Sequence, residues 1–437
     1  MPLSDQSLQD AAPDTPPGAV PDPAATRASR HRWVILALLF FITVVNIIDR
    51  QTLSVLAPLL RAAFNLSNAH YGRIVAALQF GMMTGELPMG WLMDRWGPRI
   101  GLGIAVFWWS SATGSQVLAR SGVQLGLSRF WMGTGECGNY SGGIKTLTRL
   151  FAKKERTLAI GIFNSGSVIG STIAPPLIVY LLERHGLRAA FIVPALLGFF
   201  WIPVWWLAHG REPKIVATNA LPVVTTSAML RTSSAWAVML CRFFVGPVMQ
   251  FYWYWIPSYL YSVRHLSMLQ IGLWSWLPFL MGDTGGVAGG WAAGRLFALG
   301  ISTRNVRRIT MYAGSVLCLA SLLVPTLRSG KSALLMIGVA IMADNFVSAN
   351  MFAAIGDLFP DQQVGRATGL TGVAGGLSGL LFPLLTGILV DRFSYTPVFF
   401  LVGFLPLVGT WALFLFGSDY HSLRHSAGKP SGLATGS

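Results

Sequence analysis

Long apolar stretches alternate with short polar connections along most of the chain. Twelve stretches of about 19 residues or more can be drawn, six before residue 209 and six after residue 234. They cover residues 33–60, 71–91, 100–118, 123–150, 158–182, 189–207, 236–261, 269–296, 309–327, 333–358, 367–390 and 398–416. As a helix, each is long enough to cross a hydrocarbon layer of about 30 Å. With 53% hydrophobic and 11% charged residues, the composition excludes a soluble fold of this size. The pattern predicts an all-α integral membrane protein with 12 transmembrane helices.

The polar segments divide the chain into two membrane domains, a linker and two tails. Residues 1–26 are rich in Pro, Ala and Asp and contain no signal-peptide pattern. The longest connection holds Pro213, Pro222 and a run of Thr and Ser, as a linker does. The predicted parts are a disordered cytoplasmic tail (1–32), an N-terminal six-helix bundle (33–208), a cytoplasmic linker (209–234), a C-terminal six-helix bundle (235–417) and a cytoplasmic tail (418–437).

The net charge of +15 reflects topology and gives no reason to expect nucleic acid as a partner. If the N-terminus lies inside, one side of the membrane collects 19 Lys and Arg residues and the other collects nine. The positive-inside rule then places both termini in the cytoplasm. We expect a multi-pass protein of the inner membrane, with the lipid bilayer as its surroundings.

Enzyme chemistry has little support in the sequence. No phosphate-binding glycine loop is followed by Lys and Ser or Thr, and His and Cys form no metal-ligating cluster. The three cysteines lie in apolar stretches, which argues against a disulfide framework. We therefore expect no enzyme activity, no metal and no cofactor, and an ion gradient as the energy source.

Four charged residues lie deep inside two of the apolar stretches. Asp49 and Arg50 interrupt the first, and Arg129 and Glu136 interrupt the fourth. A charge at the bilayer centre costs at least about 2.5–3.5 kcal/mol on insertion scales, so such residues commonly mark a functional cavity. From the helical rise, Arg50 lies roughly 15 Å and Glu136 roughly 20 Å from the outer ends of their stretches. Asp49, Arg50 and Glu136 are thus predicted to share a level near the midplane.

These four residues suit an anionic substrate and a proton. The planar guanidinium of Arg50 can hold a carboxylate by two hydrogen bonds, although a permanent pair with Asp49 or Glu136 is the alternative. Arg129 lies seven residues before Glu136 on the same helix face, where it can contact substrate, orient Glu136 or close the outer side. Burial and a nearby arginine shift a carboxyl pKa in opposite directions, which suits Asp49 and Glu136 to proton coupling.

Uncharged polar side chains in the same stretches are candidates for binding sugar hydroxyl groups. Each is about as well explained as a hydrogen bond between neighbouring helices, but together they are too many for an apolar drug pocket. The candidates are Asn46, Asn139, Asn164, Ser167, Gln250, Tyr252, Tyr254, Asn345 and Asn350.

The two halves repeat each other and carry a family motif. Gly90-Trp91-Leu92-Met93-Asp94-Arg95 ends the second stretch, and Gly290-Trp291-Ala292-Ala293-Gly294-Arg295 ends the eighth. The pattern Gly90-x-x-x-Asp94-Arg95-x-Gly97-x-Arg99 resembles the loop motif of the major facilitator superfamily. The resemblance implies 12 helices in two pseudo-symmetric bundles and a cytoplasmic gate at this motif. The gate candidates are Gly90, Asp94, Arg95, Arg99 and Arg156.

A narrower resemblance covers most of the chain. Asn46-x-x-Asp49-Arg50, Gly135-Glu136-Cys137-Gly138-Asn139, Lys153-Lys154-Glu155-Arg156 and Phe163-Asn164-x-Gly166-Ser167 are similar to the anion:cation symporter family, and most of all to its hexuronate (galacturonate and glucuronate) branch. In that family, acids at the positions of Asp49 and Glu136 are linked to proton coupling. Met82 stands where the aldonate transporters have a tyrosine, which favours hexuronate over aldonate.

Together these features predict a monomeric importer of a small sugar acid, driven by proton symport and working by alternating access. Other carboxylates, such as an aldonate, tartrate or an aromatic acid, remain alternatives. A cation or drug exporter leaves two buried arginines unexplained, and a non-transporting sensor lacks a signalling domain. Asp283, Lys145 and Glu86 receive no role from the sequence.

Overall fold

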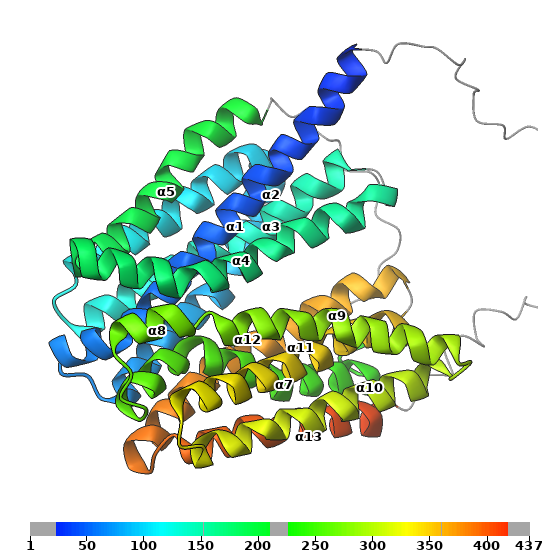
Figure 1. Cartoon of the computed structure of the whole chain (residues 1–437). Coiled ribbons are helices and arrows are strands. Elements are labelled where there is room, and N and C mark those ends of the chain that lie inside the picture. The colour runs from blue at the N-terminus through cyan, green and yellow to red at the C-terminus, as the bar shows by residue number, and fades with distance from the viewer. Residues whose placement is uncertain (1–22, 152, 210–225, 360, 418–437) are drawn as a thin grey trace, which may run out of the picture.

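A computed structural model describes residues 23–151, 153–209, 226–359 and 361–417, and within these ranges every regular element is a helix (Figure 1). The N-terminal half contains α1 (Pro23–Ala63), α2 (Asn68–Ser115), the short 3-10 helix η1 (Gln116–Leu118), α3 (Gly122–Leu150), α4 (Lys153–His185) and α5 (Leu187–Ala208). The C-terminal half contains α6 (Thr226–Met229), α7 (Ser233–Ser262), α8 (Met268–Trp274), α9 (Leu277–Ala298), α10 (Thr303–Leu317), the 3-10 helix η2 (Cys318–Thr326), α11 (Gly330–Leu358), α12 (Asp361–Arg392) and α13 (Thr396–Phe416).

The 12 predicted spans all appear within the described residues, but four are built differently from a single helix. The second and third are joined in α2 around Gly97, whose φ of 75° and ψ of 164° break the helix. Glycine adopts a positive φ without a steric penalty, so the chain turns here without a loop. The eighth span is α8 followed by α9, and the ninth is α10 continued by η2.

Eight of the described helices are long and apolar enough to cross a membrane by length and composition alone. The helices α2, α3 and α9 are not among them, because they carry charged residues and many glycines. These three helices are therefore stabilised in the membrane by packing against other helices rather than by their own apolarity.

Glycines bring main chains into direct contact inside each bundle. A Cβ at Gly133 of α3 would overlap the carbonyl oxygen of Leu78 in α2, and one at Gly81 would overlap that of Phe130. In the C-terminal bundle a Cβ at Gly285 of α9 would overlap the carbonyl oxygen of Met342 in α11. Small residues permit this close approach in membranes, where dispersion contacts replace the hydrophobic effect as the force between helices.

The two bundles meet at the end of the molecule where α1 leads into α2, and they splay apart toward the other end (Figure 1). Asp391 at the end of α12 accepts hydrogen bonds from the main-chain N–H groups of Asn68 at 2.9 Å and Ala69 at 2.7 Å. These free N–H groups at the start of α2 favour a carboxylate. Deeper in, Tyr71 Oη donates to the carbonyl of Tyr254 at 2.8 Å.

We expect Gly133→Ala to lower the melting temperature of the protein purified in detergent. The added Cβ meets main chain that cannot rotate away, and overpacking of this kind costs about 1–3 kcal/mol. Gly161→Ala on α4 is the matched control, because a Cβ at Gly161 has no neighbour within 4 Å. Equal melting temperatures for the two variants would contradict the tight packing of α2 on α3.

Candidate functional site

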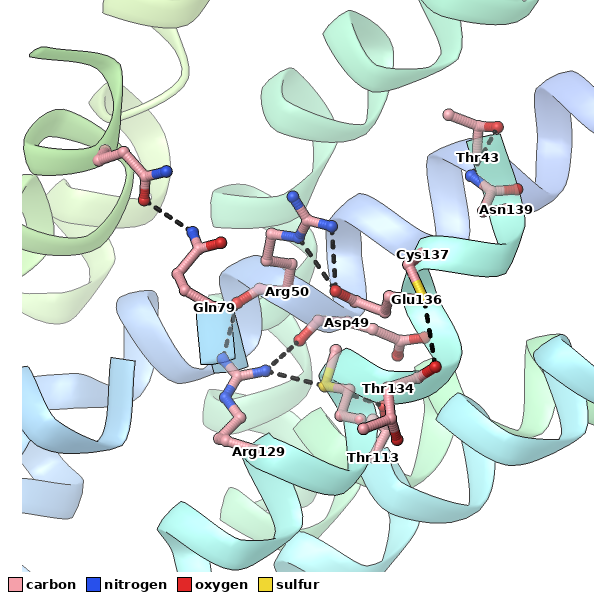
Figure 2. Close-up of polar contacts among 12 residues, drawn as sticks. Thr43, Asp49, Arg50, Gln79, Thr113, Arg129, Thr134, Glu136, Cys137 and Asn139 are labelled. Carbon is pink, nitrogen blue, oxygen red and sulfur yellow. Dashed lines mark hydrogen bonds and ion pairs between the residues drawn. The ribbon is translucent and has the colours of Figure 1, made fainter. Parts of the chain in front are cut away.

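An arginine–carboxylate pair joins α1 to α3 in the middle of the N-terminal bundle (Figure 2). Arg50 donates to Oε2 of Glu136 from Nη2 at 3.0 Å and from Nε at 3.2 Å. The Glu136 side chain is fully buried, whereas 13% of the Arg50 side chain is exposed. Oε1 of Glu136 has no hydrogen-bond partner among the described residues. Glu136 therefore binds Arg50 through a single carboxylate oxygen, Oε2.

Arg129 is sealed inside the protein and holds the main chain of α1. Its Nη2 donates to the carbonyl of Arg50 at 2.7 Å and its Nη1 to the carbonyl of Asp49 at 3.3 Å (Figure 2). The residue has no exposed surface. Of the three roles open from the sequence, direct contact with substrate fits this placement least, because the guanidinium is enclosed and its strongest bond goes to a backbone carbonyl.

Asp49 lies beside this network and next to the indole of Trp109. The residue is fully buried, and neither carboxylate oxygen has a well-aligned hydrogen bond to the described residues. It interacts electrostatically with Glu136 and Arg129. Two carboxylates and two guanidinium groups thus share the region, and their formal charges sum to zero. Adding or removing one proton shifts this balance.

A cavity of about 290 Å³ lies between α4 of the N-terminal bundle and α7, α9 and α11 of the C-terminal bundle. Its polar and aromatic lining includes Ser167, Ser171, Arg242, Gln250, Trp253, Asp283, Asp344 and Asn345. The guanidinium carbon of Arg50 lies 6.0 Å from the ring centroid of Trp253, so the charged network of the N-terminal bundle borders this cavity.

Several polar residues expected from the sequence lie at this junction. Ser167, Gln250 and Asn345 line the cavity. Tyr254 interacts electrostatically with Arg50 and Glu136, and its hydroxyl group has no described partner.

Asn46 and Asn139 are buried in the N-terminal bundle. The side-chain nitrogen of Asn46 has no described partner. Asn139 donates to the hydroxyl of Thr43 at 3.2 Å, while its own oxygen is unpaired (Figure 2). Both retain hydrogen-bonding capacity for a ligand or for water.

Three other candidates lie away from this cavity. The hydroxyl of Tyr252 bonds to that of Ser321 at 2.7 Å inside the C-terminal bundle. Asn350 donates to the carbonyls of Gly289 and Phe346. Asn164 is exposed and is not part of the cavity lining. Tyr252 and Asn350 therefore connect helices of one bundle, which is the alternative that the sequence left open.

The motif at the bend of α2 makes its contacts inside the N-terminal bundle. Asp94 pairs with Lys145 of α3, whose ammonium group also donates to the carbonyl of Met93 at 2.9 Å. Arg95 stacks against Trp91 in the same helix, with 5.8 Å from the guanidinium carbon to the ring centroid. The turn is made by Gly97, and a Cβ at Gly90 would have no neighbour within 4 Å.

Two further arginines predicted for this gate donate to main-chain carbonyls. Arg99 bonds to the carbonyl of Trp206 in α5 at 2.9 Å. Arg156 bonds to the carbonyl of Thr148 in α3 at 2.9 Å. Both contacts stay within the N-terminal bundle, as does the pair of Arg32 with Glu155 that ties α1 to α4.

Sequence reasoning missed two charged residues of the cavity, Arg242 and Asp344. The signal was present, because both interrupt apolar stretches just as Arg50 and Glu136 do. Gln79 was missed as well. It donates to Gln250 at 2.7 Å and so links α2 to α7 (Figure 2).

Comparison with known proteins gives consistent matches over most of the chain. The family profile described as Major Facilitator Superfamily matches residues 39–349 and, in a second match, residues 292–435. The hexuronate transporter of Escherichia coli (strain K12) is 29% identical over 86% of this chain and 92% of its own length. The "Probable L-galactonate transporter" of the same strain is 27% identical over 84% of this chain and 85% of its own length. These relatives confirm the resemblance to sugar-acid transporters expected from the motifs.

The fold has a close counterpart among solved structures. A bacterial homologue of the human lysosomal transporter Spinster, in an inward-facing and occupied conformation, superimposes with a TM-score of 0.72 over 90% of this chain and 97% of its own. At 18% identity this likeness concerns the fold alone. It agrees with the predicted 12 helices in two six-helix bundles.

Replacing Arg129 by leucine is expected to destabilise the protein strongly. The substitution leaves the two buried carboxylates of Asp49 and Glu136 with Arg50 as their one neighbouring guanidinium group among the described residues. Leaving a buried charge uncompensated in this way costs about 3–5 kcal/mol. The measurement is the melting temperature in detergent. Arg120→Leu, at an exposed arginine just before α3, is the control and should melt like the wild type. If Arg129→Leu also melts like the wild type, Arg129 does not hold α1 in place.

Proposed function

The chain belongs to the major facilitator superfamily, and on that premise we propose that it imports a small sugar acid, most simply a hexuronate, by proton symport. It is a multi-pass membrane protein with two six-helix bundles, which is the architecture of a transporter with alternating access. One observation carries the proposal. Arg50, beside the cavity, is held by a single oxygen of the buried acid Glu136.

Arg50 is the proposed ligand of the substrate carboxylate. A guanidinium group never loses its charge in a protein and presents two parallel donors, a geometry that matches a carboxylate. In the structure Glu136 already accepts hydrogen bonds from Nε and Nη2 of Arg50. A substrate carboxylate therefore competes with Glu136 for Arg50.

Protonation of Glu136 resolves this competition. A neutral carboxyl group attracts Arg50 less, so the guanidinium becomes free for the substrate. Without the proton, substrate and Glu136 would place two negative charges beside one arginine in a buried site. Binding of the anion and of the proton are thereby coupled through Arg50. Asp49, enclosed next to Glu136, is proposed as the second proton-coupling acid.

Neutral groups around Arg50 suit the hydroxyls of a sugar. The indole nitrogen of Trp253 and the hydroxyl of Tyr254 are buried and have no partner among the described residues. Ser167, Gln250 and Asn345 offer both donors and acceptors from three helices. The relative with 29% identity is a hexuronate transporter, which favours a hexuronate as the substrate. The relative with 27% identity is named a probable L-galactonate transporter, so an aldonate is the second candidate.

We propose that the protein lies in the inner membrane with both termini in the cytoplasm, because the side that carries more Lys and Arg residues favours the cytoplasm. The end where Asp391 meets α2 then faces outward, and the splayed end faces the cytoplasm. On this orientation, we propose that the splayed end opens toward the cytoplasm and that the carrier works as a monomer. Opening to the outside requires the bonds of Asp391 to α2, of Tyr71 to Tyr254 and of Gln79 to Gln250 to break.

Uptake into proteoliposomes tests the proposal. We expect labelled galacturonate or glucuronate to accumulate when an inward proton gradient is imposed and not when it is abolished. Arg50→Ala should reduce uptake at least about tenfold, because a hydrogen bond to a charged group contributes about 1.5–3 kcal/mol. Glu136→Gln should lose gradient-driven accumulation by a similar factor but keep exchange of labelled for unlabelled substrate.

Glu183→Gln, at an exposed acid near the end of α4, serves as the control and should behave like the wild type. Uptake that ignores the gradient in the wild type would contradict proton symport. Absence of uptake and of binding for every sugar acid would contradict the proposed substrate class.

A further inference from the structure

Glu86 is an exposed acid within α2, on the face of the helix that is turned toward the C-terminal bundle. It follows Gln79 by seven residues, so the two side chains lie on one helix face, two turns apart. Gln79 donates to Gln250 of α7, which fixes the direction of this face. None of the ion pairs among the described residues includes Glu86. An unpaired carboxylate is therefore exposed where the two bundles face each other.

Glu86 lies at the level of the buried acid Glu136. A Cβ at Gly85 of α2 would overlap the carbonyl oxygen of Thr134 in α3. Glu86 follows Gly85 directly, and Glu136 lies two residues after Thr134, so both acids lie within one helical turn of this contact. The thiol of Cys137 interacts electrostatically with both of them. The two acids thus lie on either side of one point on α3.

The two bundles part at the same level. Toward their closed end, a Cβ at Gly376 of α12 would lie 2.9 Å from Cγ of Met83 in α2. One turn further along α12, a Cβ at Gly372 would have no neighbour within 4 Å. Because α2 and α12 run antiparallel, Gly372 lies opposite the turn of α2 that carries Glu86. Glu86 is therefore accessible from the splayed end of the molecule (Figure 1).

Glu136 has no such access of its own. Its side chain has no exposed surface, Oε2 is held by Arg50, and Oε1 is buried without a partner among the described residues. In the proposed cycle Glu136 reaches the state open to the cytoplasm with a proton, and it must lose this proton before it pairs with Arg50 again. The proton therefore needs an acceptor between the buried carboxyl group and the cytoplasm.

We propose that Glu86 takes the proton from Glu136 and releases it to the cytoplasm. After the substrate has left Arg50, the O–H bond of Glu136 breaks and the proton passes through water to a carboxylate oxygen of Glu86. Glu86 then gives the same proton to water between the bundles, and the anionic Glu136 binds Arg50. This inference rests on the proposed function, since it assumes that Glu136 carries the proton across the membrane.

Water rather than the thiol of Cys137 carries the proton between the two acids. The thiol donates its hydrogen to the carbonyl of Thr134 at 3.2 Å, so it is already engaged. A thiol is also a weaker acid than a carboxyl group by about four pH units in model peptides, so it is a poor acceptor and a poor donor for this step.

The surroundings of Glu86 suit a group that changes its charge in every cycle. The titratable or charged side chains of α3 between residues 125 and 145 are Arg129, Glu136, Cys137, Tyr140 and Lys145. Of the two cations, Arg129 donates to the main chain of α1 and Lys145 pairs with Asp94. The facing part of α12, residues 369–373, has no charged side chain. Glu86 can therefore gain and lose a proton without breaking an ion pair.

Transport by the purified full-length protein in proteoliposomes tests the inference, with labelled galacturonate as the probe. We expect Glu86→Gln to slow uptake driven by an inward proton gradient at least about tenfold, because a positioned acid–base group accelerates proton transfer by this factor or more. Exchange of labelled for unlabelled galacturonate needs no net release of protons and should keep the wild-type rate. The final accumulation should also reach the wild-type level, because coupling through Glu136 is intact. Glu86→Asp should regain part of the rate.

The dependence on internal pH separates a proton carrier from a structural residue. Histidine loses its proton about two pH units above glutamate in model peptides. The ratio of the uptake rate of Glu86→His to that of the wild type should therefore fall as the internal pH is lowered from about 8 to about 6. Glu183→His, at an exposed acid near the end of α4, is the matched control, and its ratio should stay constant.

Three results overturn the inference and leave the proposed symport standing. A wild-type rate of net uptake in Glu86→Gln excludes Glu86 from the path of the proton. An equal loss of net uptake and exchange in this variant, with an unchanged melting temperature, assigns Glu86 to substrate binding. A ratio for Glu86→His that does not change with internal pH shows that residue 86 does not titrate during release. Uptake by the wild type that ignores the proton gradient removes the proposed symport itself, and the inference with it.

Discussion

An arginine inside a membrane protein needs an acceptor at every moment, and the structure is organised around this constraint. A guanidinium group keeps its charge, and Arg129 has no exposed surface while 13% of the Arg50 side chain is exposed. Each has a different solution. Arg129 donates to main-chain carbonyls of α1, Arg50 donates to one oxygen of Glu136, and Arg242 interacts electrostatically with Asp344. Of the two hydrogen-bonded arginines, Arg50 can exchange its partner, because the acceptor is a side chain, whereas the backbone carbonyls that hold Arg129 are fixed in α1.

The sequence predicted the fold well and the site in part. The apolar stretches and the distribution of positive charges depend on local composition alone, so they can be recognised directly in the sequence. The charges of Asp49, Arg50 and Glu136 were found because a buried charge in a span is rare. Rotation of a helix about its axis depends on its neighbours, and for this reason Tyr252 and Asn350 point into their own bundle. The continuity of α2 past Gly97 depends on a single backbone angle that no pattern reveals.

Glycines bring main chains together within each bundle, and the contact between the bundles adds exchangeable side-chain hydrogen bonds. Within a bundle, glycines such as Gly133 and Gly285 place main chain against main chain, and this geometry tolerates no sliding. Between the bundles, Gly72 of α2 likewise lies against main chain of α12, and side-chain hydrogen bonds such as that of Gln79 with Gln250 add to the contact. Amide side chains can rotate and find other partners. Each bundle is therefore suited to move as a rigid body, with the binding groups divided between the two.

The contact between Asp391 and the start of α2 affects how easily the two bundles separate at this end of the molecule. Asp391 is exposed, and its partners are main-chain N–H groups at a helix end that water reaches. When the contact breaks, water solvates both sides, so no polar group is left stranded. We therefore expect separation of the two bundles to depend more on the contacts deeper in, around Tyr71 and Gln79. The contact of Asp391 with α2 can therefore break and re-form at little net cost in free energy.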